Sequence, residues 1–171
     1  NMDYKVSKYG VSVINLEGII SGVLNPPDDA LLYVDEIGQM QLFSEKFKDL
    51  VIRYLDSENT FVATLSCVYK HSLITHIKRR DDVIFVELSA DNRDQKYEFI
   101  SQLVQKIEKA RKYFAEPERL TTKGRKVQLE SEHGTRELYT VALGKWVCNC
   151  DFYSQYDICS HAIAVEELAR S

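Results

Sequence analysis

Residues 30–38, with the sequence ALLYVDEIG, begin with a short, continuously apolar run and then reach two neighbouring carboxylates. A run without polar alternation is typical of a strand buried on both faces, as in a parallel sheet. Residues 60–65 and 83–88 are two further runs of this kind, and apolar residues at helical spacing in 47–55 and 73–77 separate the three. Strand, helix, strand, helix, strand predicts an α/β layer with right-handed crossovers.

The second part of the chain changes its apolar period. A long amphipathic helix is expected over residues 95–114, with an apolar face made of Phe99, Leu103, Ile107, Ala110 and Phe114. Pro117 indicates a stop, so residues 116–124 are interpreted as a linker between domains at 1–117 and 118–171. Alternating residues in 127–131 and 138–143, and a third strand from Trp146, predict a small antiparallel meander that a helix over 160–169 follows.

Composition limits the class of protein. The chain has 171 residues, 44% hydrophobic and 28% charged, which is typical of a globular fold and excludes collagen-like or wholly disordered chains. A net charge of −4 argues against a broad basic nucleic-acid surface but allows a local basic patch. No apolar run reaches the roughly 18–20 residues that span a bilayer, and no signal-peptide pattern begins the sequence. We therefore expect a cytoplasmic protein without a membrane partner.

Three of the four cysteines lie close together near the end of the chain. The pattern is Cys148-x-Cys150, eight residues, then Cys159-x-His161. Without an export signal, such a cluster predicts metal ligation before disulfides. Three thiolates and an imidazole can complete a tetrahedral structural Zn²⁺ site, which would stabilise a domain of roughly 50 residues that buries little core. The alternatives are chance proximity or a single disulfide.

This part of the chain resembles a known zinc module. Residues 123–169 are similar to the SWIM zinc finger through the meander, the Cys-x-Cys and Cys-x-His pairs, and Ala164 three residues after the histidine. The resemblance implies a module that binds DNA or a protein partner, and it does not imply catalysis. Lys123, Arg125 and Lys126, which open this region, could contact phosphates or could simply belong to a flexible linker.

The two carboxylates after the first apolar run have the form of a Walker B strand. In P-loop enzymes the aspartate helps to hold Mg²⁺ and the adjacent acid orients the attacking water. The simpler interpretation of Asp35 and Glu36 is a solvated turn at a strand end.

Residues 4–116 resemble the carboxyl-terminal two-thirds of the thermostable nucleoside-triphosphatases of archaea and bacteria. The similar stretches, in family order, are residues 8–11, 35–44, 62–65, 77–80 and 92–94. The resemblance implies a RecA-like α/β fold related to Mg²⁺-dependent hydrolysis of nucleoside triphosphates. On that analogy Asp35 would organise Mg²⁺ and Glu36 would activate water, while Asn92 and Arg93 would lie near the nucleotide.

One family motif is missing from these residues. The sequence contains no Gly-x-x-x-x-Gly-Lys-Ser/Thr, the loop that cradles the phosphates. The parallel sheet is then expected to lack its P-loop strand and to expose an apolar edge. A homodimer or a hetero-partner is expected to cover that edge, by strand pairing or through the apolar face of the 95–114 helix. Alternatively, residues 4–25 fold back into the gap.

Two functions of different class follow. The favoured one is a non-catalytic zinc-binding interaction protein that uses the SWIM module to bind DNA or a protein partner. The alternative is a Mg²⁺-dependent nucleoside-triphosphatase whose P-loop comes from a missing N-terminal segment or a partner chain. The P-loop is the feature that separates the two, and we expect no hydrolysis that depends on Glu36 from these residues alone.

Overall fold

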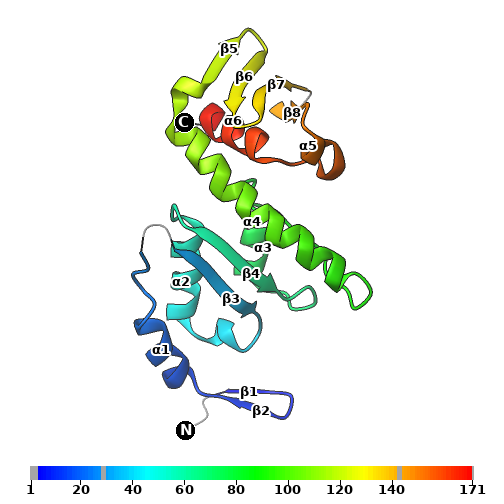
Figure 1. The fold of residues 1–171 in the computed structure, drawn as a ribbon. Coiled ribbons are helices and arrows are strands. Elements are labelled where there is room, and N and C mark those ends of the chain that lie inside the picture. Colours follow the sequence, from blue (N-terminus) through cyan, green and yellow to red (C-terminus); the bar gives the residue numbers. More distant parts are fainter. Residues whose placement is uncertain (1–3, 28–29, 142–143, 171) are drawn as a thin grey trace. The chain divides into compact units, whose positions relative to one another are not determined.

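The computed structural model describes residues 4–27, 30–141 and 144–170. The chain divides into two compact units, Asn1–Phe85 and Val86–Ser171 (Figure 1), and each is described by itself. The first combines helices with a parallel sheet and the second with an antiparallel sheet, so the expected mixed α/β class is confirmed. None of the described helices is long and apolar enough to span a bilayer. A cytoplasmic location stays a prediction.

The first unit is built on two parallel strands and the helix that connects them. Strands β3 (Leu31–Ile37) and β4 (Thr60–Leu65) pair with Tyr33 opposite Val62. Between them run the short helix η1 (Gln41–Phe43) and helix α2 (Glu45–Leu55), and helix α3 (Ser72–Lys78) follows. Two of the three expected strands and both expected helices are therefore confirmed.

Helix α2 forms because a cap and an apolar stripe act together. The Ser44 hydroxyl accepts a hydrogen bond from the Phe47 amide at 3.1 Å, which satisfies one of the free donors at the helix start. Its buried residues recur at helical spacing and face β3 and α3; the core contains Leu32, Ile37, Phe47, Leu50, Val51, Tyr54, Ile74 and Ile77. This core lies on one face of the parallel pair.

Residues 4–25 fold beside the parallel sheet rather than into it. Strands β1 (Tyr4–Val6) and β2 (Tyr9–Val11) form a separate hairpin, and helix α1 (Val13–Ser21) contacts α2. The Tyr54 hydroxyl donates to the Val23 carbonyl at 2.6 Å, and the Ser44 hydroxyl donates to the Glu17 carboxylate at 3.1 Å. The alternative in which this segment adds a strand to β3 and β4 is therefore wrong.

The prediction of a third strand at residues 83–88 is also wrong. This segment has no regular secondary structure, and the side chains of Ile84, Phe85 and Leu88 are 42%, 52% and 50% exposed. A strand needs a neighbour for its backbone donors and acceptors. Among the described residues, β3 and β4 pair only with each other. An apolar run alone therefore did not suffice to make a strand here.

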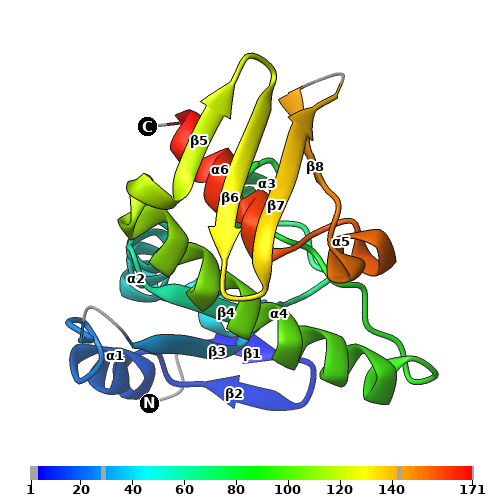
Figure 2. The same cartoon turned by 45° about the horizontal axis from the view of Figure 1, so that its top comes forward.

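The second unit packs helices against a four-stranded antiparallel sheet. Helix α4 (Arg93–Ala115) comes first and is followed by β5 (Leu120–Lys123), β6 (Lys126–Ser131), β7 (Gly134–Thr140) and β8 (Trp146–Cys148) in spatial order (Figure 2). Helices α5 (Asp151–Tyr156) and α6 (Ser160–Arg170) end the chain. The expected meander and final helix are confirmed.

The expected linker is largely ordered secondary structure. Residues 116–124 contain the short helix η2 (Pro117–Arg119) and strand β5, whose residues pair with β6. Helix α4 packs against α6 and supplies Ala110 and Tyr113 to the second core. The structure consequently divides between Phe85 and Val86, not at the linker expected from the sequence.

Candidate metal centre

The four predicted ligands come together in the second unit. Their donor atoms, one from each side chain, all lie within 4.8 Å of one another, and all four residues are buried; the cluster is Cys148, Cys150, Cys159 and His161. Tetrahedral Zn²⁺ with Zn–S bonds of about 2.3 Å separates its ligands by roughly 3.8 Å. The donors are therefore within about 1 Å of that spacing. None of the four cysteines, all of which are described, forms a disulfide.

Regular structure positions each ligand. Cys148 ends β8, where it pairs with Leu138 of β7. Cys150 caps α5, and its sulfur accepts a hydrogen bond from the Tyr153 amide at 3.4 Å. After α5, Asp157 adopts a left-handed conformation with φ of 57°, and the chain turns toward α6. The Cys-x-Cys pair therefore joins a strand end to a helix start.

The second pair of ligands lies at the start of α6. The Cys159 sulfur accepts a hydrogen bond from the Ala162 amide at 3.3 Å, and His161 lies in the first turn of the helix. The Nδ1 atom of His161 is 3.6 Å from the Cys148 sulfur. Amide donors that point at sulfur stabilise a thiolate, the form that binds a metal.

The thiols influence one another strongly. A hydrogen bond with Cys159 lowers the pKa of the Cys148 thiol to about 4, with burial opposing the shift and His161 assisting it. The same hydrogen bond, together with burial, raises the pKa of Cys159, and burial raises the pKa of Cys150. Several thiolates can share such a buried space only when a cation compensates their charge. This donor set of soft sulfurs and one imidazole suits Zn²⁺, and four buried protein ligands are typical of a structural site.

Sequence reasoning missed the residue that covers the histidine. Tyr113 of α4 is 1% exposed, and its ring stacks on the His161 ring at 5.6 Å between centroids. Its hydroxyl donates to the Glu132 carboxylate at 2.6 Å, and Lys109 lies 2.7 Å from the same carboxylate. The expected apolar face of α4 included Phe114, which is 36% exposed. Tyr113 lies three residues after Ala110, so the buried face of the helix also fits a spacing that continues through Tyr113 instead of Phe114.

The predicted nucleotide residues are divided between the two units. Asp35 and Glu36 lie exposed near the end of β3; the Asp35 carbonyl accepts a hydrogen bond from the Thr64 hydroxyl at 3.1 Å. Asn92 and Arg93 belong to the other unit, where the Asn92 side chain accepts from the Ser89 amide at 2.9 Å and Arg93 is 3.7 Å from Asp94. Their nucleotide and Mg²⁺ roles stay predictions.

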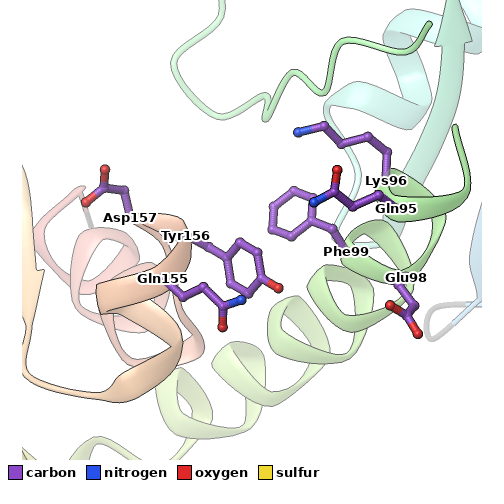
Figure 3. Close-up of a pocket in the computed structure, with 7 residues that line it drawn as sticks. All are labelled: Gln95, Lys96, Glu98, Phe99, Gln155, Tyr156 and Asp157. Carbon is purple, nitrogen blue, oxygen red and sulfur yellow. The ribbon is translucent and has the colours of Figure 1, made fainter. Parts of the chain in front are cut away.

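An open cavity of about 550 Å³ lies between α4 and α5 (Figure 3). The rings of Phe99 and Tyr156 lie 4.9 Å apart in it, and its polar lining mixes Lys96 with Glu98 and Asp157. None of the predicted metal or nucleotide residues lines this cavity. Its facing aromatic rings are best explained as packing between the two helices.

Comparison with known proteins matches the two ends of the chain to different families. The family model for NTPase matches residues 1–101, and the model for the SWIM zinc finger matches residues 139–169. Nucleoside-triphosphatase THEP1 of Thermotoga petrophila is 39% identical over 95 residues, covering 53% of this chain and 51% of that protein. The THEP1 protein of Aquifex aeolicus is 33% identical over 109 residues, covering 59% and 61%.

A third relative, THEP1 of Methanosarcina barkeri, is 34% identical over 91 residues, covering 53% of this chain and 51% of that protein. The chain thus spans about half the length of the curated relatives it matches. No solved structure matches the chain. With an NTPase match over more than half its length and a buried cluster of three cysteines and one histidine inside its SWIM match, the chain belongs to the NTPase family and carries a SWIM zinc finger.

Proposed function

We propose that this chain is a zinc-dependent interaction protein whose SWIM module binds DNA or a protein partner. The observation that carries the proposal is the buried cluster of Cys148, Cys150, Cys159 and His161. Four protein ligands leave no coordination position for a substrate, so zinc here would organise a binding surface rather than activate water. The same ion would hold β8, α5 and α6 together.

In this proposal the NTPase-related unit is a RecA-like sheet without its P-loop strand, and it acts as a scaffold. Two parallel strands joined through α2 support that interpretation. The 171 residues contain no phosphate-cradling loop, and Asp35 and Glu36 are exposed to solvent. Carboxylates alone would bind Mg²⁺ and nucleotide poorly, because the loop supplies the lysine and the hydroxyl that complete the site.

Metal analysis combined with a binding assay tests the main proposal. Purified chain is expected to contain near one equivalent of Zn²⁺ and to retain DNA, or a protein partner, only in its zinc-loaded form. The Cys159→Ser variant is expected to lose both properties. Cys67→Ser is the matched control, because Cys67 is exposed and lies in the first unit. Undiminished zinc in Cys159→Ser would disprove the ligand assignment.

A second candidate is a nucleoside-triphosphatase whose P-loop comes from a further segment or a partner chain. It is supported by the Asp-Glu pair on β3 and by the THEP1 relatives, which are named nucleoside-triphosphatases. Phosphate release from ATP or GTP with Mg²⁺, measured with the segment or partner chain that carries the P-loop present, distinguishes the candidates. The scaffold role predicts background rates for both wild type and Glu36→Gln. Wild-type turnover that Glu36→Gln abolishes would favour the enzyme.

The uncovered face of the parallel sheet supports a partner for the first unit. We define the open face as Leu31, Tyr33, Val62 and Thr64, and the side chains of Leu31 and Tyr33 are 52% and 62% exposed. Parallel sheets are usually covered on both faces. We propose that a second copy of the chain, or a hetero-partner, packs against this face or completes the sheet by pairing with a free edge of β3 or β4.

Light scattering tests that arrangement. A homodimer predicts a mass near twice 19.8 kDa. The double variant Leu31→Ser/Tyr33→Ser is expected to be monomeric, whereas the control Ile14→Ser/Ile19→Ser, which changes exposed residues of α1, is expected to stay dimeric. A wild-type mass that stays monomeric at high concentration would exclude the homodimer and leave the hetero-partner.

A further inference from the structure

Four cationic side chains gather at one end of the antiparallel sheet. Lys123 of β5 pairs with Lys126 of β6, and Arg125 lies in the turn between them, beside Gly124 with φ of 63°. The Arg125 carbonyl accepts a hydrogen bond from the Thr140 amide, and the Lys145 carbonyl accepts one from the Val141 amide at 2.9 Å. The β5–β6 turn and the start of β8 thus lie at the same end of the sheet (Figure 2). We call these four residues the basic end.

The basic end is free of acidic neighbours within the strands that form it. Residues 120–129 and 138–150 contain no aspartate or glutamate. Lys123, Arg125, Lys126 and Lys145 are exposed. Within the described part of the chain, none of them forms an ion pair; Lys145 lies 6.0 Å from the ring of Tyr153. A chain with net charge −4 therefore holds a local concentration of positive charge here.

An exposed aromatic side chain accompanies the cations. Tyr139 is 44% exposed and lies directly opposite Lys126 across the β6–β7 pair. Trp146, opposite Thr140, lies on the other face of the sheet and packs against the core. Cations that track a phosphate backbone, together with an exposed ring on which a base can stack, are the usual elements of a surface that binds single-stranded nucleic acid.

The dimensions of the sheet fit several phosphates. Neighbouring strands lie about 4.8 Å apart, so β5 to β8 spans roughly 14 Å. One strand of duplex DNA carries a phosphate for about every 3.4 Å along the helix axis, and its phosphates are farther apart in space because the strand winds around that axis. The width of the basic end is therefore enough for about two or three phosphates of one strand.

We propose that the basic end binds the phosphodiester backbone of a nucleic acid, with Lys123, Arg125, Lys126 and Lys145 contacting its phosphates and Tyr139 against a base. The inference rests on the proposed function and selects nucleic acid from its two partner classes. Lys123, Arg125 and Lys126 would then belong to a binding surface and not to a flexible linker, because β5 and β6 hold them in fixed register.

Fluorescence anisotropy with zinc-loaded full chain tests the inference. The probes are a labelled oligothymidylate and a duplex of equal length, each titrated over a series of salt concentrations. The slope of log affinity against log salt is negative, and every lost phosphate contact reduces its magnitude by about 0.7 for single strands and about 0.9 for duplex. The triple variant Lys123→Gln/Arg125→Gln/Lys126→Gln is expected to reduce that magnitude by about 2 on single strands.

A matched variant removes the same charge elsewhere. Lys5→Gln/Lys8→Gln/Lys70→Gln changes three exposed lysines of the first unit and is expected to keep the wild-type slope. Both triple variants must retain wild-type zinc content and circular dichroism. An unchanged slope in the basic-end variant, or an equal loss in the matched variant, would overturn the assignment.

The probes separate the two parts of the proposal. Tyr139→Ala is expected to weaken binding of the single strand and to leave the duplex unaffected; equal binding of the single strand would exclude base stacking. Zinc-loaded chain that binds neither probe at low salt, but retains a protein partner, would overturn this inference and preserve the proposed function. Chain that binds no zinc would overturn the proposed function itself.

Discussion

The two sheets of this chain are covered very differently. In the second unit, Leu129 and Leu138 are 0% exposed, because α4, α6 and the metal cluster close over the inner face of the antiparallel sheet. In the first unit, Val51 is equally buried, yet Leu31 and Tyr33 on the open face are more than half exposed. The second unit therefore covers the inner face of its sheet with its own helices, whereas the first unit covers only one face of its sheet.

Removing one metal ligand should produce the largest difference in stability between the two units. In Cys159→Ser, we expect the second unit to lose its cooperative unfolding transition, because zinc binding supplies roughly 10–16 kcal/mol of apparent folding free energy in small modules. Trp146, the single tryptophan, reports on this unit through its fluorescence. The first unit should keep its helical circular dichroism. A fluorescence transition that matches that of Cys67→Ser would contradict the dependence on the metal.

A substitution in the core of the first unit should destabilise that unit and leave the second unit unchanged. Leu50 is 3% exposed in the first core, so Leu50→Ala is expected to cost that unit about 2–5 kcal/mol in denaturant unfolding followed by circular dichroism. Zinc content and the Trp146 transition should not change. The same chemical change at half-exposed Leu31 should cost less than about 1.5 kcal/mol. Equal costs at the two positions would contradict a one-sided core.

The buried polar contact of the first unit should have a smaller effect. Ser44 is 0% exposed, caps α2 and donates to Glu17 of α1. Ser44→Ala removes both interactions, and the expected loss is about 1–2 kcal/mol of unfolding free energy. A double-mutant cycle with Glu17→Ala divides the loss between cap and inter-helix contact. A variant as stable as wild type would show that neither contact contributes.

The corresponding contact of the second unit, between Glu132, Lys109 and Tyr113, is partly exposed and should have the smallest effect. Lys109 and then Tyr113 lower the pKa of the Glu132 carboxyl to about 2. A lowered pKa stabilises the fold above about pH 4.5, and the contribution is lost as pH falls toward 2. Because half of the Glu132 side chain is exposed, Glu132→Gln should cost less than about 1 kcal/mol at pH 7. A larger loss, with zinc retained, would show that Glu132 supports Tyr113 over the histidine.

The sequence predicted the elements whose signals are local. The apolar stripe of α2, the strand at 60–65 and the four ligands needed no distant information. Strand β5 was missed because Pro117 and Gly124 indicate breaks, although Gly124 makes the hairpin turn that lets β5 pair with β6. The strand predicted at residues 83–88 was wrong for the reverse reason, since this apolar run pairs with no described strand. Pairing is a property of two segments, and one segment cannot reveal it.

Helix α4 limits where the length of this chain can change. Its 23 residues, about 34 Å of helix, begin within the NTPase match and end with Tyr113 against His161. Each residue inserted or deleted upstream of Tyr113 within the helix would rotate its ring by about 100° relative to the first turn. Within α4, we therefore expect tolerance only for insertions and deletions that keep the phase of the helix. Natural variation in length should accordingly fall outside α4, and chimaeras between such proteins should be joined before Arg93 or after Ala115.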